Sequence, residues 1–292
     1  MDFFFIHLLN ALLSAATLFL IAGGLSLIYG VMRIVNLAHG NLYAFGAYVT
    51  AWTLGRALAG APTPLLYLAL PAGAVGAALL GAVLEPTLLR PFYKRAEEYQ
   101  LLVTFGLLMI LGDVMHFVWG PYPLSASALW ENSGSVSIAG NPYPNYNLVV
   151  IAIGGIAAAF LWFFVYKTRF GVVLRATSQN MRMASALGVD VNRMYVQAFT
   201  LGCFMAGLGG AIIVPSQSAV LDMGVDALVL SFIVVVIGGL GSLEGALVGA
   251  LIVGVVREAG IAWFPEIELA VLYLMAAAVL LVRPAGLFGR AT

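Results

Sequence analysis

Long apolar segments alternate with short polar ones along almost the whole chain. Each apolar segment is close to the roughly 20 residues that a helix needs to cross a bilayer at about 1.5 Å per residue. The pattern therefore predicts an all-α fold, a polytopic transmembrane helical bundle that forms one domain over residues 1–292. We place the spans at residues 6–29, 36–57, 64–85, 99–119, 146–166, 196–216, 227–257 and 261–283.

The segment 227–257 is longer than one span needs, and glycines interrupt it. Because glycine adopts turn conformations that other residues resist, we expect two short helices joined by a break near residues 238–242. The chain then crosses the membrane eight or nine times. The break either shapes a transport site, as broken helices can, or is a tight turn between packed helices. Its residues are Gly238, Gly239, Gly241, Ser242 and Gly245.

Basic residues are scarce and unevenly placed, which predicts the orientation of the chain. There are 13 Lys and Arg in all, and a cluster of them falls in the polar stretch 167–193, between two spans. By the positive-inside rule this stretch is cytoplasmic. If successive spans on either side of this stretch cross the membrane in opposite directions, the N-terminus lies outside and the C-terminus in the cytoplasm. Arg56 and Arg257 are then the only basic residues expected outside.

The same polar stretch contains the pattern of a short helix. Thr177 and Ser178 offer N-cap hydroxyls, the helix itself is predicted over residues 179–187, and Gly188 supplies a stop. A helix this short is only marginally stable in isolation, and we therefore expect it to pack against a cytoplasmic partner. The alternative is an amphipathic helix that lies on the lipid surface. The residues of this predicted contact are Ser178, Gln179, Met181, Arg182, Ala184, Leu187 and Gly188, with Met181, Ala184 and Leu187 along one side.

A second polar group lies at the start of the second span. Asn36, His39 and Asn41 stand in or beside an apolar segment, where polar side chains are costly unless they face a cavity or another helix. The spacing of Asn36, Gly40 and Tyr43 places them on one helical face. Two interpretations remain open: a solute path lined by Asn36, His39, Asn41 and Tyr43, or helix–helix contacts through buried amides and small residues.

Composition and missing motifs narrow the class of protein. The chain is 62% hydrophobic and 9% charged, against about 25% charged residues in soluble domains. A formal net charge of zero argues against a nucleic-acid partner. Neither Lys94 nor Lys167 follows a glycine, so no phosphate-binding P-loop is present, and we find no catalytic or metal-ligand spacing. We therefore expect a transport protein rather than an enzyme, without metal or cofactor.

Several motifs, in this order along the chain, resemble those of one family, the permease subunits of bacterial ABC importers for branched-chain amino acids. The resemblance is to the smaller of the two related permeases in such importers. The motifs are GLSLIYG (24–30), VNLAHG (35–40), GAY (46–48), RATSQN (175–180), LGVD (187–190), IGGLGS (237–242) and GALVG (245–249).

The resemblance implies a permease in the bacterial inner (cytoplasmic) membrane that passes branched-chain or related amino acids by alternating access. Its implied partners are two cytoplasmic ABC ATPases that hold the helix 179–187 and hydrolyse ATP, a second related permease in a heterodimer, an external solute-binding protein and the lipid bilayer. Alternatives are the same class of importer carrying urea, short amides or another small carboxylate, and a proton-coupled secondary transporter. The last would need intramembrane carboxylates, for which Asp113, near His116, is the candidate.

Overall fold

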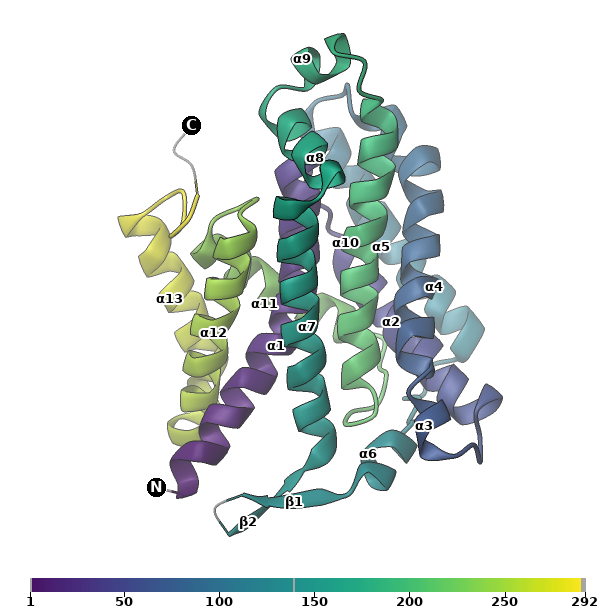
Figure 1. Cartoon of the computed structure of the whole chain (residues 1–292), viewed down its shortest axis with the longest axis vertical. Coiled ribbons are helices and arrows are strands. Elements are labelled where there is room, and N and C mark those ends of the chain that lie inside the picture. The colour runs from purple at the N-terminus through teal and green to yellow at the C-terminus, as the bar shows by residue number, and fades with distance from the viewer. Residues whose placement is uncertain (1, 139, 290–292) are drawn as a thin grey trace.

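The computed structural model describes residues 2–138 and 140–289 and shows a helical membrane bundle, as predicted (Figure 1). Within those residues, 7 helices are long and apolar enough to cross a membrane, and α11 (Met223–Gly238) is a shorter apolar helix. The long ones are α1 (Asp2–Met32), α4 (Ala69–Leu84, extended by tighter and wider turns to Phe92), α5 (Glu97–Trp119), α7 (Asn145–Lys167), α10 (Val191–Ile213), α12 (Leu243–Trp263) and α13 (Glu268–Val282 with the short turn before it).

The two ends of the bundle carry different short elements, as Figure 1 shows. One end, here called the hairpin end, holds the start of α1, the short helices α3 (Thr63–Leu66) and α6 (Ala128–Ser133), and an antiparallel hairpin. The other end, the α9 end, holds α8 (Arg169–Gln179), α9 (Met181–Ala186) and the end of α13. The hairpin pairs β1 (Ser135–Ile138) with β2 (Asn141–Pro144).

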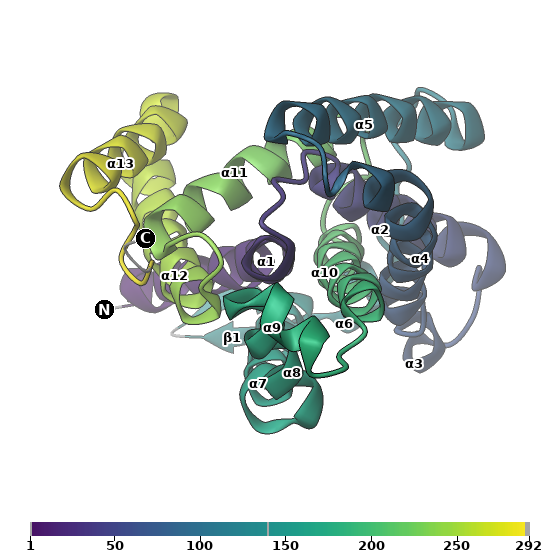
Figure 2. The same ribbon diagram turned by 90° about the horizontal axis from the view of Figure 1, so that it is seen from above.

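Helices α1 and α10 form the centre of the bundle, and α2, α4, α7, α11 and α12 surround them (Figure 2). Small residues permit this packing, because α1 and α10 touch through their backbones: a Cβ on Gly24 would lie 2.5 Å from the carbonyl oxygen of Gly202. In lipid, where apolar side chains gain little from leaving their surroundings, such close backbone approach is a main source of helix association.

Helix α2 (His39–Trp52) begins three residues later than the predicted span 36–57, and a π-helical turn (Thr53–Ala57) completes it. Residues 33–38 are not helical, and Arg33 has a φ of 55°. The Asn36 side chain accepts a hydrogen bond from the backbone N–H of Ala38 (3.1 Å), a local turn that competes with helix. The predicted shared helical face of Asn36, Gly40 and Tyr43 is therefore wrong, since Asn36 precedes the helix.

The starts of two other spans differ from the predicted ones, for reasons visible in the chain. α10 starts at Val191 rather than 196 because Asp190 caps it, accepting from the N–H of Arg193 at 3.0 Å. The last span starts at Glu268 rather than 261, because α12 continues to Trp263 and a short 3-10 turn with Pro265 follows. The predicted break in 227–257 is present: α11 ends at Gly238 and α12 begins at Leu243.

Candidate functional site

The first turns of α2 and α11 meet deep inside the bundle. The ring of His39, at the start of α2, lies 3.0 Å (Nε2) from the carbonyl oxygen of Ile21, eleven residues before the end of α1. At about 1.5 Å per residue this is roughly 16 Å from that end, half the thickness of a bilayer core. A Cβ on Gly40 would lie 1.9 Å from the carbonyl oxygen of Gly224 in α11, so the two backbones are in contact. We call this meeting point the α2–α11 junction.

Three of the four residues predicted to line a path lie at this junction. Asn36 and His39 are 0% exposed and Asn41 is 3% exposed. The amide nitrogen of Asn41 donates to the carbonyl oxygen of Leu108 in α5, and its amide oxygen is the atom nearest to a Cβ placed on Gly224. Asn41 thus joins α2 to α5 and α11, which supports the interpretation as a helix contact.

The junction also holds buried polar atoms without a hydrogen-bond partner among the described residues: Nδ2 of Asn36, Nδ1 of His39 and Oδ1 of Asn41. Leaving such an atom unpaired costs about 1–3 kcal/mol. Neither α2 nor α11 has a side-chain N-cap, so two helix N-termini with their partial positive charge also point here. Among these atoms only Nδ2 of Asn36 is a donor. Oδ1 of Asn41 is an acceptor, and so is Nδ1 of His39 while Nε2 of the same ring donates to a carbonyl oxygen. The junction thus offers a solute both donors and acceptors, and its role in a solute path is a hypothesis.

Tyr43 lies apart from these three residues. Its ring packs 3.3 Å from a Cβ placed on Gly209, and its carbonyl oxygen lies against Gly210, so this side of α2 faces α10. Residues two positions apart on a helix do not face the same way, which explains why Asn41 reaches α5 and Tyr43 does not.

The predicted helix 179–187 is divided into two helices. α8 ends at Gln179, and Asn180 (φ −150°, ψ 91°) breaks the path and caps α9, accepting from the N–H of Met183 at 2.9 Å. The predicted cap Ser178 instead donates to the carbonyl oxygen of Arg175 inside α8. Asparagine is as good an N-cap as serine, so the N-terminal signal was assigned two residues too early. The predicted stop is present, since Gly188 has a φ of 86°.

The surface of α9 also differs from the expected one. Ala184 is 4% exposed and faces the protein, whereas Leu187 is 79% exposed. Met181 and Met183 are exposed as well, and the sulfur of Met181 accepts a hydrogen bond from the hydroxyl of Tyr195. The predicted contact row of Met181, Ala184 and Leu187 is therefore wrong at Ala184, and the exposed apolar residues of α9 and its C-cap are Met181, Met183 and Leu187.

Sequence reasoning missed α8, although the chain carries its signals. Thr168 caps it by accepting from the N–H of Gly171 (3.2 Å), and Leu174 and Thr177, three residues apart, are buried on one face. Arg175 donates to the carbonyl oxygen of Val165 at the end of α7 and lies over the ring of Tyr166. These contacts hold α8, which directly precedes α9, against the end of α7.

The glycine-rich break is a tight turn at the α9 end of the bundle, away from the α2–α11 junction. Gly239 and Gly241 have φ values of 107° and 78°, and Ser242 caps α12 by accepting from the N–H of Gly245 at 3.0 Å. A Cβ on Gly238 would lie 2.0 Å from the carbonyl oxygen of Gly245, so no larger residue fits there. Of the two interpretations, the geometry is that of the turn between packed helices.

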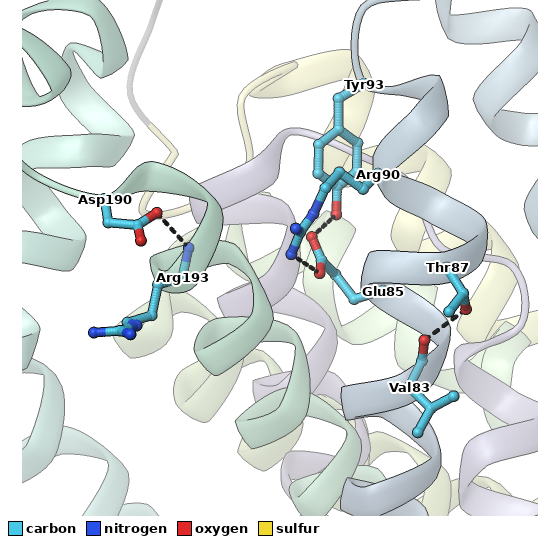
Figure 3. A network of polar contacts seen from close by, with 7 residues as sticks. All are labelled: Val83, Glu85, Thr87, Arg90, Tyr93, Asp190 and Arg193. Atoms are coloured by element: carbon cyan, nitrogen blue, oxygen red, sulfur yellow. Dashed lines mark hydrogen bonds and ion pairs between the residues drawn. The ribbon is translucent and has the colours of Figure 1, made fainter.

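A polar cluster at the α9 end was also not predicted (Figure 3). The Glu85 carboxylate, fully buried, accepts from Arg90 Nη2 at 2.9 Å and from the Tyr93 hydroxyl at 2.6 Å. Burial, and then the bond to Glu85, raise the pKa of Tyr93 well above its ordinary value, so the hydroxyl remains a donor. Arg90 and Tyr93 lie five and eight residues after Glu85, and such spacings do not share one face of a regular α-helix. Here the three residues meet because residues 85–89 form a π-helical turn.

Comparison with known proteins identifies the family of this chain. Residues 7–281 match the family model described as branched-chain amino acid transport system / permease component. The permease LivH of a high-affinity branched-chain amino acid transport system from Salmonella typhimurium is 27% identical, with 99% of this chain and 96% of LivH covered. BraD from Pseudomonas aeruginosa, a permease described in the same words, is 26% identical over 97% of this chain and 95% of BraD.

A solved structure has the same fold. It is PsaBC from Streptococcus pneumoniae in complex with Fab, with a TM-score of 0.50, 14% identity, and coverage of 94% of this chain and 89% of that one. At that identity the likeness concerns the fold alone, and the family rests on the match over residues 7–281. The chain is a member of the family of branched-chain amino acid transport permeases.

Proposed function

We propose that this chain forms one half of the membrane path of an ATP-driven importer for branched-chain amino acids, with the α9 end in the cytoplasm. The N-terminus and the hairpin then lie outside, where a solute-binding protein delivers the amino acid. Two ATPase subunits on the cytoplasmic side hydrolyse ATP, and each holds the α9 of one permease. Family membership supports this arrangement, and so do the 12 basic residues in the described part of the chain, all but two of which lie before or after spans at the α9 end.

The observation that carries the coupling part of the proposal is the exposed surface of α9. A helix of 6 residues stands beyond the membrane spans and exposes Met181, Met183 and, just after it, Leu187. Met183 and Leu187, four residues apart, lie on the same side of it, and large apolar side chains exposed side by side mark a protein or membrane contact. Short helices presented to a groove are a common mode of recognition between proteins. A cleft in an ATPase subunit fits this apolar face and the neighbouring Arg182.

We propose that a second, related permease covers the face made by α5 and α13, which lie on the same side of the bundle (Figure 2). These are the spans with the least burial, and Phe117 of α5 is 91% exposed. Asp113 and His116 are also exposed on α5 and have no side-chain partner within the described part of the chain. Because a charge facing lipid is costly, this face fits a protein neighbour better than lipid.

Uptake into vesicles tests the function. The chain is co-expressed with the ATPase, second permease and binding protein encoded beside it, and the purified complex is reconstituted in proteoliposomes containing ATP. Radiolabelled leucine, isoleucine and valine should accumulate, while urea and a short amide at the same concentration should not. Accumulation of urea in preference to leucine, or uptake that proceeds without ATP, would overturn the proposal.

A further inference from the structure

A groove runs along the seam between α4 and α10, two helices that lie side by side (Figure 2). It consists of two hollows. One, of about 570 Å³, lies at the α9 end and is polar; the other, of about 300 Å³, lies deeper and is apolar. Val196 and Gln197 line both hollows, so the two form one continuous groove. We call it the α4–α10 groove.

The side chains that α10 contributes change in character along the groove. Arg193, Gln197, Leu201 and Phe204 follow one another at spacings of four, four and three residues, so they share one face of the helix. They cover eleven residues, or about 16 Å at 1.5 Å per residue, which is close to the thickness of one leaflet of the hydrocarbon core. The face thus changes from cation to amide to hydrocarbon over one leaflet.

The polar hollow carries charges of both signs. Arg90 lies across from Asp190 and Arg193 at the start of α10, as Figure 3 shows. Glu85 already neutralises Arg90 through a 2.9 Å ion pair, but Nε of Arg90 is buried and has no partner among the described residues. The charges left for a ligand are therefore the exposed Arg193 and the carboxylate of Asp190. A group that bears both a negative and a positive charge complements them.

The deeper hollow suits hydrocarbon with one polar attachment. Ala78 of α4 and Leu201 and Phe204 of α10 line it. Thr200 lines it as well, and its Oγ1 is buried without a partner in the part of the chain that the structure describes. An ester carbonyl entering the hollow would accept a hydrogen bond from this hydroxyl, and an acyl chain would continue beside Phe204.

We propose that the α4–α10 groove binds one glycerophospholipid whose headgroup carries both a phosphate and an ammonium, of the phosphatidylethanolamine class. The phosphate meets Arg193 and the ammonium meets Asp190. Gln197 and Thr200 lie at the level of the glycerol esters, and one acyl chain fills the apolar hollow. Basic pockets between membrane helices on the cytoplasmic side are a recurrent form of lipid-binding site. The proposal requires only that the chain lies in a membrane, and it does not depend on which solute passes.

Native mass spectrometry of the full chain tests this proposal. The detergent-purified protein, stripped of lipid and then offered equal amounts of phosphatidylethanolamine and phosphatidylglycerol, should retain one lipid, mainly phosphatidylethanolamine. Asp190→Asn keeps the N-cap of α10 but removes the charge, and should shift the ratio toward phosphatidylglycerol by about fivefold, the upper end of the effect of an exposed ion pair. Arg193→Gln should lower retention of both lipids, as should Leu201→Trp, which fills the apolar hollow.

Arg56→Gln, at the hairpin end, removes a cation outside the groove and should leave retention unchanged. Glycerophosphoethanolamine, which has the headgroup without acyl chains, should not displace the lipid. Equal retention by Leu201→Trp and the unaltered chain would overturn the proposal, as would an unchanged lipid ratio in Asp190→Asn or displacement by the soluble headgroup. Arg193→Gln that keeps its lipid but no longer binds the ATPase would assign the groove to a protein partner instead.

Discussion

Gly40 and Gly224 hold the α2–α11 junction together by backbone contact, since a Cβ on Gly40 would lie 1.9 Å from the carbonyl oxygen of Gly224. Each residue lies in the first turn of a helix that begins inside the bundle. The contact makes the junction intolerant of side chains, and it places the polar residues of α2 next to the N-terminus of α11.

Gly40→Ala should therefore destabilise the protein by about 1–3 kcal/mol, the usual effect of overpacking, with a lower midpoint of thermal unfolding in detergent. Gly155→Ala in α7 is the matched control, because nothing lies within 4 Å of a Cβ at that position. Alanine is the better helix former, so the control should unfold at the same temperature or higher. Equal midpoints for the two variants would contradict the close contact at the junction.

His39 separates the two interpretations of the junction. In His39→Gln the amide nitrogen can replace Nε2 as the donor to the carbonyl oxygen of Ile21, but nothing replaces the unpaired Nδ1. If Nδ1 serves the solute, this variant should assemble normally and take up leucine about tenfold more slowly, the effect of one hydrogen bond to a charged group. Normal uptake by His39→Gln, together with lost assembly in His39→Leu, would assign the residue to helix packing.

Labelling of single cysteines tests the orientation. Cys203 is fully buried and should not react, so the native chain serves as the background. In intact cells, a membrane-impermeant thiol reagent should label Ser135→Cys in the exposed hairpin and leave Ser185→Cys on α9 unlabelled until the cells are opened. The opposite pattern would reverse the orientation and remove α9 from the cytoplasm.

The sequence could predict the bundle, the break in 227–257 and a short helix near residue 181, because each depends on local signals: apolar length, glycine and capping residues. It could not predict where α2 begins. Besides the local turn at Asn36, the hydroxyl of Thr104 in α5 donates to the carbonyl oxygen of Val35 (3.4 Å), and the sequence does not show that contact. The sequence pattern of residues 36–57 is also that of an ordinary span.

The burial of Ala184 was missed for a related reason. Spacing along one helix gives its faces but not which face meets the rest of the protein, and α8, which orients α9, was not foreseen. The cluster around Glu85 was missed because its spacing belongs to a π-helical turn. In each case the missing information is three-dimensional contact.

The exposed face of α9 makes a prediction about assembly. Leu187→Asp places a charge at a position that is 79% exposed, so the permease should still fold and insert but should no longer co-purify with the ATPase. Ser185→Asp is the control, since at 100° per residue it lies on the opposite side of α9 from both Met183 and Leu187. It lies on the side of Met181, whose sulfur already accepts a hydrogen bond from Tyr195. Ala184→Asp is less informative, because a charge at this buried position also disturbs the packing of α9. Loss of the ATPase in Ser185→Asp but not in Leu187→Asp would place the contact elsewhere.

The most direct test of the central claim, that this chain couples ATP hydrolysis to amino-acid passage through α9, is the rate of ATP hydrolysis by the reconstituted complex. Leucine-loaded binding protein should stimulate hydrolysis when the complex contains the unaltered permease or Ser185→Asp. With Leu187→Asp the stimulation should disappear, even at ATPase concentrations high enough to drive assembly. Full stimulation of the Leu187→Asp complex by leucine would contradict the claim.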